Sequence, residues 1–170
     1  MKNKCGLILV KPQLGENVGA CARSMKNFCF SKLYVVDPKF SFPNHKAKAT
    51  SVGAYDIISK AKVFDKIENA LNPFNLIISL SARRRDINKK HISLEEFQKI
   101  IKRRNLSLGL MFGPEASGLS NKDLSFANDI LKIPTSTKFK SLNLSHSLTV
   151  VCYEICKLMN EKKIKSKGIN

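Results

Sequence analysis

The sequence predicts an α/β protein in which a parallel sheet is flanked by helices. Short aliphatic or β-branched runs, each bounded by Gly, Pro, Asp or charge, alternate along the chain with segments of helical periodicity. Continuous apolar runs of this length are typical of strands buried on both faces of a parallel sheet that helices cover. With 170 residues, 43% hydrophobic and 25% charged, the chain has the size and composition of one globular domain.

The first half of the chain carries three predicted strands and two predicted helices. Cys5–Val10 is an uninterrupted apolar run, and Leu33–Val36 and Phe74–Ser79 are further runs of the same kind. Between them, Val18–Phe28 and Asp65–Leu71 have helical spacing. The apolar face of the first helix consists of Val18, Cys21, Met25 and Phe28. Strand and helix therefore alternate here, as an α/β fold requires.

The second half continues this pattern and ends in a long helix. Ser93–Arg103 is predicted as a helix because Ser93 and Glu96 form a capping box at its start. Leu106–Phe112 and Ile130–Ile133 are predicted strands. The last helix, about Leu142–Met159, places apolar residues at helical spacing: Leu144, Leu148, Val151, Ile155 and Leu158. No repeat or linker divides the chain, so we expect one domain over residues 1–160 and a basic tail over residues 161–170.

The charge of the chain favours a polyanionic partner. Thirty Lys and Arg against 13 Asp and Glu give a net charge of +17, and the excess is spread over both halves of the chain. Such an excess indicates nucleic acid more than a membrane surface. The alternative is a general Lys-rich compositional bias, which the many Lys and Asn residues would also fit.

The five cysteines indicate a reducing compartment. Their number is odd and no CxxC pair occurs, so neither a disulfide framework nor a zinc site is predicted, and we expect no metal. Cys152 and Cys156 lie four residues apart on an apolar helical stripe, where buried reduced thiols are expected. The apolar run Cys5–Val10 is too short for a signal peptide or a membrane span, which predicts a cytoplasmic protein without membrane contact.

Three loops that follow predicted strands are rich in polar residues. In the first, Asn17 opens a helix and Arg23 stands among small residues, where its guanidinium could bind phosphate or simply be solvated. The second carries Glu115 where a strand ends, a position at which a carboxylate is often functional. Gly113 and Gly118 have P-loop spacing, but Leu119 replaces the required Lys, which excludes a nucleotide triphosphatase.

The third loop follows Ile133 and leads into the last helix. Ser141 and Asn143 stand at the helix start, where either could be a cap. His146 beside Ser145 suggests a hydrolase, but no third partner is found and adjacent helical residues point apart. A separate basic segment, Arg83–Arg85, follows a predicted strand and favours phosphate contact.

These three loops, in this order, resemble the three motifs of the SpoU branch of the SPOUT RNA methyltransferases. The first motif matches Asn17–Arg23 with Asn27-Phe28, and the second matches Phe112–Glu115 with Gly118-Leu119. The third is similar to Ile133-Pro134, Ser141–Ser145 and Tyr153-Glu154. The resemblance spans the chain from Leu7 to about Glu154.

The resemblance implies a fold, a cofactor and a set of site residues. The parallel sheet would carry a C-terminal trefoil knot, and two copies would form a homodimer with active sites at the interface. S-adenosylmethionine would be held largely by backbone groups at Leu80, Ser81, Ala82, Gly113, Ile133, Lys140, Ser141 and Leu142. The residues that carry over as catalytic are Arg23, Asn17, Glu115, Ser141 and Asn143, with Asn17 and Glu115 orienting Arg23 and the RNA.

Within this branch the chain is most similar to the TrmJ type, through the GACAR segment and Ser81–Arg85. That resemblance implies 2′-O-methylation of cytidine or uridine at position 32 of the tRNA anticodon loop. Two alternatives within the class are tRNA position 34 and ribosomal RNA. An alternative of another class is a non-catalytic RNA-binding protein on the same fold.

Overall fold

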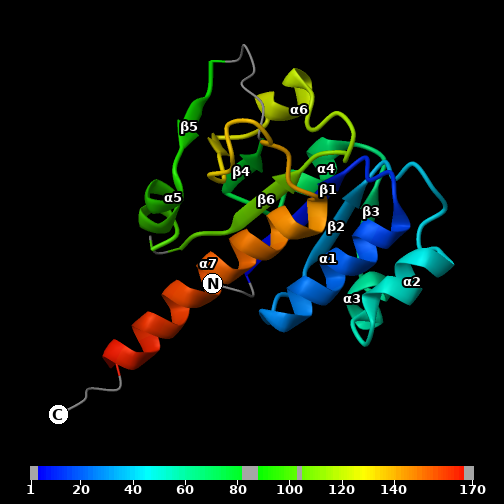
Figure 1. Ribbon diagram of the computed structural model, residues 1–170, viewed down its shortest axis with the longest axis horizontal. Helices are drawn as coiled ribbons and strands as arrows, with labels where there is room; N and C mark the ends of the chain where they lie inside the picture. The colour runs from blue at the N-terminus through cyan, green and yellow to red at the C-terminus, as the bar shows by residue number, and fades with distance from the viewer. Residues whose placement is uncertain (1–3, 82–87, 103–104, 167–170) are drawn as a thin grey trace.

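A parallel β-sheet forms the centre of the molecule (Figure 1). The structure is a computed structural model that describes residues 4–81, 88–102 and 105–166. Within these ranges seven strands form one sheet in the order β3-β2-β1-β6-β4-β7-β5, and every neighbouring pair is parallel. Strand β1 (Cys5–Val10) lies between β2 (Leu33–Val36) and β6 (Leu108–Phe112). The predicted parallel α/β sheet is confirmed.

The predicted strands are all present, and two further strands lie at the edges of the sheet. The remaining inner strands are β4 (Leu76–Leu80) and β7 (Asp129–Leu131), each shifted by one or two residues from its prediction. The edge strands β3 (Lys62–Phe64) and β5 (Lys90–Ile92) were not predicted. Both are three residues long and largely exposed, so neither has the apolar run on which the prediction depended.

The four predicted helices are also present. They are α1 (Gly15–Asn27), α4 (Ile67–Leu71), α5 (Leu94–Ile100) and α7 (Leu144–Ser166), and the capping box of Ser93 and Glu96 opens α5 as expected. Helix α7 continues past its predicted end at Met159, so residues 161–166 of the predicted tail are helical. Three short helices were missed: α2 (His45–Ser51), α3 (Tyr55–Ser59) and α6 (Asn121–Ser125).

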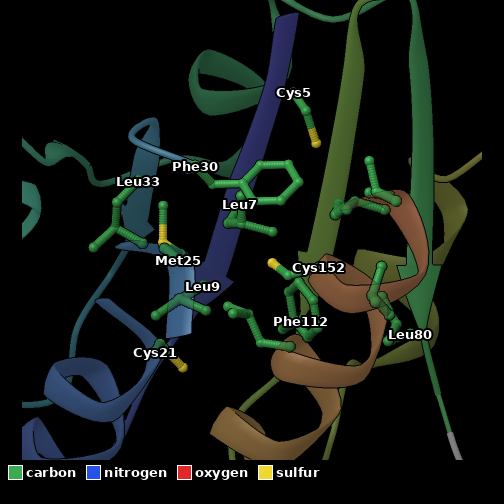
Figure 2. Packing of buried hydrophobic residues seen from close by; sticks show 14 of the residues in the cluster. Cys5, Leu7, Leu9, Cys21, Met25, Phe30, Leu33, Leu80, Phe112 and Cys152 are labelled. Carbon is green, nitrogen blue, oxygen red and sulfur yellow. The ribbon is translucent and has the colours of Figure 1, made fainter. Parts of the chain in front are cut away.

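Side chains of the sheet alternate between two apolar layers. On β1, Cys5, Leu7 and Leu9 face the layer formed with α1 and α7, whereas Ile8 and Val10 face the layer formed with α4 and α6. Figure 2 shows the first layer, where β1 meets residues of α1, α7 and β6. Helices α1 and α7 lie across the same face of the sheet, and the far end of α7 extends away from it (Figure 1).

Three of the cysteines belong to this apolar layer. Cys5, Cys21 and Cys152 are completely buried, whereas Cys29 is exposed. The expected burial is confirmed for Cys152 and is wrong for Cys156, which is only partly buried. Burial raises the pKa of the Cys5 thiol to about 12. Among the residues that the structure describes, no helix is both long enough and apolar enough to span a bilayer.

One buried side chain of β4 offers a test of the packing. The Ser79 hydroxyl is fully buried and has no hydrogen-bond partner among the described residues. Replacing Ser79 with Ala removes this unsatisfied group, so we expect the free energy of unfolding in urea to rise by about 1 kcal/mol. The matched control is Ser51→Ala, because buried Ser51 donates to the Lys48 carbonyl at 2.7 Å and its loss should destabilise the protein. If Ser79→Ala destabilised the protein as much as Ser51→Ala does, the conclusion that the Ser79 hydroxyl has no hydrogen-bond partner would be wrong.

Candidate active site

A cavity of about 690 Å³ lies at the carboxyl ends of β4, β6 and β7. Three segments line it: the end of β4, the loop after β6, and the segment that joins β7 to α7. All the described residues predicted to bind the cofactor are among its lining residues: Leu80, Ser81, Gly113, Ile133, Lys140, Ser141 and Leu142. Ala82 and the basic segment Arg83–Arg85 lie outside the described residues.

The walls of the cavity combine an apolar surface with a polar rim. Apolar side chains are contributed by Leu80, Phe112, Leu131, Ile133 and Leu144, and polar ones by residues such as Thr135, Lys138, Lys140 and Ser141. This size and composition are typical of a small-molecule site. The loop after β6 folds tightly onto Gly113, because a Cβ there would lie 2.6 Å from the carbonyl carbon of Gly118.

A hydrogen-bond network beside this cavity connects the three polar loops. Asn17 Nδ2 donates to Glu115 Oε1 at 2.9 Å, and Asn143 Nδ2 donates to Asn17 Oδ1 at 3.0 Å. These residues follow β1, β6 and β7, whose carboxyl ends share one edge of the sheet. The structure therefore brings together Asn17, Glu115 and Asn143, three of the predicted catalytic residues. We call this set the Asn143–Asn17–Glu115 network.

The two ends of the network fix the direction of its hydrogen bonds. At one end the Ser145 backbone N–H can only donate, and it binds Asn143 Oδ1 at 2.8 Å. At the other end the Glu115 carboxylate accepts from Asn17 and from the backbone N–H groups of Gln13 and Leu14, at 2.9 and 3.3 Å. Both amide groups are consequently held in one orientation.

Sequence reasoning missed several residues that support this network. Gln13 binds the Glu115 loop twice, because its side-chain oxygen also accepts from the Ala116 N–H at 3.1 Å. Across α1 and α7, the Ser24 and Thr149 hydroxyls lie 2.6 Å apart, and Thr149 Oγ1 donates to the Ser145 carbonyl at 2.7 Å. Ser145 and Thr149, which lie four residues apart in α7, are the sequence signal from which the hydroxyl contacts could have been predicted.

Arg23 lies apart from the network. Its side chain is exposed on α1, on the side facing away from the sheet, and it does not line the cavity. Asn17 and Glu115, which the resemblance expects to orient Arg23, bind each other in this chain. Ser141 lines the cavity.

The charges near the cavity are uneven. Glu115 is the one acidic residue that lines it in the described part of the chain, against Lys138 and Lys140 on the rim. Burial raises the pKa of the Cys21 thiol, and the negative charge of Glu115 contributes in the same direction. Within residues 4–81, 88–102 and 105–166, no three His, Cys, Asp or Glu side chains gather as metal ligands would.

The fold and the cavity define the class of protein: a parallel α/β protein with a small-molecule cavity at the carboxyl edge of its sheet, bordered by a carboxylate–amide network. Comparison with known families identifies it further. The SpoU rRNA Methylase family matches residues 4–153, and the chain belongs to this family.

Similar proteins act on tRNA. The chain is 35% identical over 168 residues to the tRNA (cytidine-2′-O-)-methyltransferase TrmJ of Methanocaldococcus jannaschii, covering 96% of this chain and 70% of that protein. It is 34% identical over 151 residues to the tRNA (cytidine/uridine-2′-O-)-methyltransferase TrmJ of Photorhabdus laumondii, covering 88% of this chain and 62% of that protein. The crystal structure of TrmJ from Z. mobilis superposes with a TM-score of 0.86 at 34% identity, covering 90% of this chain and 69% of that one.

Proposed function

We propose that this protein transfers a methyl group from S-adenosylmethionine to the ribose 2′-hydroxyl of cytidine or uridine at position 32 of the tRNA anticodon loop. One observation carries the proposal: the loops of the second and third SpoU motifs line a single cavity together with the end of β4, and the Asn143–Asn17–Glu115 network joins the first motif to them. The TrmJ relatives support tRNA as the substrate, and the chain spans 70% and 62% of the two TrmJ sequences described above.

The cavity fits S-adenosylmethionine. Its volume of about 690 Å³ lies within the usual range for such ligands, and its walls offer apolar surface for an adenine ring beside backbone groups and hydroxyls. When bound, this cofactor supplies a methyl group on a positively charged sulfur. The residues proposed to hold it are Leu80, Ser81, Ala82, Gly113, Ile133, Lys140, Ser141 and Leu142, and the Glu115 carboxylate would attract its positive charge.

The chemistry depends on positioning and on loss of the hydroxyl proton, which passes to solvent water as the methyl group is transferred. A ribose 2′-hydroxyl is a weak nucleophile, and holding it in line with the methyl group contributes up to about 7–11 kcal/mol in favourable cases. The network fixes the edge of the cavity against which the ribose would lie, and Ser141 shapes the pocket. Arg23 is assigned to the RNA phosphate and to the 2′-oxygen as negative charge develops there, since guanidinium keeps its proton at neutral pH.

The exposed position of Arg23 fits a homodimer in which it serves the active site of the second copy. Two features of the same helices support such an interface. Tyr153 of α7 is 51% exposed and lies edge-on to Phe28, with ring centroids 6.2 Å apart. Arg23 projects to solvent from α1, which packs beside α7.

Further features are proposed on the resemblance alone. They are a trefoil knot that involves the segment between β7 and α7, a methyltransferase domain over residues 1–160 followed by a basic tail, and a cytoplasmic location.

The test is methyl transfer from labelled S-adenosylmethionine to tRNA transcripts altered singly through the anticodon loop. We expect label to be lost when position 32 is changed to a purine and retained with the other changes. Loss at position 34 would assign wobble methylation, and transfer to ribosomal RNA alone would assign that substrate. A protein that binds RNA but no S-adenosylmethionine would instead be the non-catalytic binding protein.

A further inference from the structure

Phe139 stands exposed at the rim of the cavity. Its side chain is 79% exposed, the largest exposure among the large apolar side chains of the described residues. The two neighbours in the chain, Lys138 and Lys140, both line the cavity, whereas Phe139 does not. Exposing an aromatic ring to water is unfavourable, so such a ring is expected to be covered by a binding partner when the protein functions.

The loop that carries Phe139 is folded and basic. Thr135 Oγ1 donates to the Lys140 carbonyl at 3.1 Å, and the Lys138 N–H donates to Ser136 Oγ at 3.2 Å. These bonds place residues 138–140 together at the rim. From Lys132 to Lys140 the sequence holds three lysines and no acidic residue, so the loop presents positive charge around the ring.

Two other exposed apolar side chains belong to segments at the cavity. Leu142 is 37% exposed and lines the cavity, and Leu14 is 49% exposed and donates its backbone N–H to Glu115, which also lines it. An exposed aromatic ring flanked by lysines is the arrangement with which proteins bind single-stranded nucleic acid, since bases stack on the ring while the lysines contact phosphates. A duplex offers no unstacked base to such a ring.

We propose that Phe139 is a stacking platform for an unpaired RNA base adjacent to the methylated nucleotide, with Lys138 and Lys140 contacting the phosphates on either side. This inference rests on the proposed function and specifies how the same site holds its RNA. Because every base has an aromatic face, the platform recognises a single-stranded loop and not a particular base. It therefore contributes to affinity for the loop, while other contacts select the nucleotide that is methylated.

The experiment measures RNA binding without turnover. A tRNA transcript with 2-aminopurine placed at single positions of the anticodon loop is titrated with protein, and the fluorescence reports both affinity and stacking. Phe139→Ala should raise Kd about 10-fold and abolish the fluorescence change at one loop position. Phe139→Trp should restore both, whereas Phe139→Leu should restore neither, because leucine is apolar but cannot stack.

Two controls separate this role from others. The Kd for S-adenosylmethionine should be unchanged in Phe139→Ala, and Val52→Ala, which alters another exposed apolar side chain outside the cavity, should leave RNA binding unchanged. Full rescue by leucine, weaker cofactor binding, or a changed oligomeric state that tracks the loss of RNA binding would overturn the proposal. A protein that stacks RNA on Phe139 yet transfers no methyl group would refute the proposed function and leave the platform standing.

Discussion

Replacing Glu115 with glutamine is expected to lower the rate of methyl transfer by about 100-fold or more. The carboxylate accepts hydrogen bonds from Asn17 and from two backbone N–H groups, and an amide brings its own NH₂ toward these donors. At least one donor then loses its partner, and the edge of the cavity loses both its negative charge and its fixed shape. Initial rates at saturating tRNA and S-adenosylmethionine measure the effect.

The control for this substitution is Glu68→Gln, which removes the same charge from α4, outside this cavity. It should leave methyl transfer within about 2-fold of the original rate. A second measurement examines the network itself: Asn17→Ala and Asn143→Ala combined should lower activity by less than the product of their separate effects, because both act through one hydrogen-bond chain. If Glu115→Gln retained full activity, the Glu115 carboxylate would not be required for methyl transfer.

Arg23→Ala is expected to reduce methyl transfer by about 100- to 1,000-fold while the affinity for S-adenosylmethionine stays unchanged. The reduction follows from losing a cation that stabilises the developing 2′-oxyanion and holds phosphate. The affinity is preserved because Arg23 does not line the cavity of its own chain. Arg23→Lys should recover only part of the activity, since an ammonium group lacks the guanidinium fork. Single-turnover rates and calorimetric cofactor binding provide the two measurements.

A mixing experiment tests whether Arg23 acts on the second copy. Arg23→Ala and Glu115→Gln are each expected to be strongly impaired, but a mixed dimer contains one site with an intact Glu115 from one copy and an intact Arg23 from the other. Refolding the two variants together should therefore restore activity. If each variant stays inactive in the mixture, Arg23 acts within its own chain. Lys60→Ala, at the C-cap of α3, is the control for loss of a surface charge.

The sequence predicted the inner part of the fold because burial determines its pattern. Cys5–Val10 and Leu33–Val36 have the predicted bounds, since both faces of these strands are covered and every position is apolar. The edge strands Lys62–Phe64 and Lys90–Ile92 have water on part of their surface, so their residues are mixed and no run of apolar residues marks them. Edge strands are defined by the neighbour with which they pair, and a sequence window does not contain that neighbour.

The active site likewise has features that the sequence predicted and features that only the tertiary structure determined. The sequence alone predicted the candidate residues Asn17, Glu115 and Asn143 in loops after strands, and it predicted the segments that line the cavity. Only the tertiary structure determined which of these side chains contact one another. Asn17 meets Glu115 across 98 positions of sequence and Asn143 across 126, because strand order and parallel direction bring three loop ends to one edge. It also decided that Arg23 faces solvent: the face of α1 that packs on the sheet fixes the helix rotation, and the arginine lies on the opposite side.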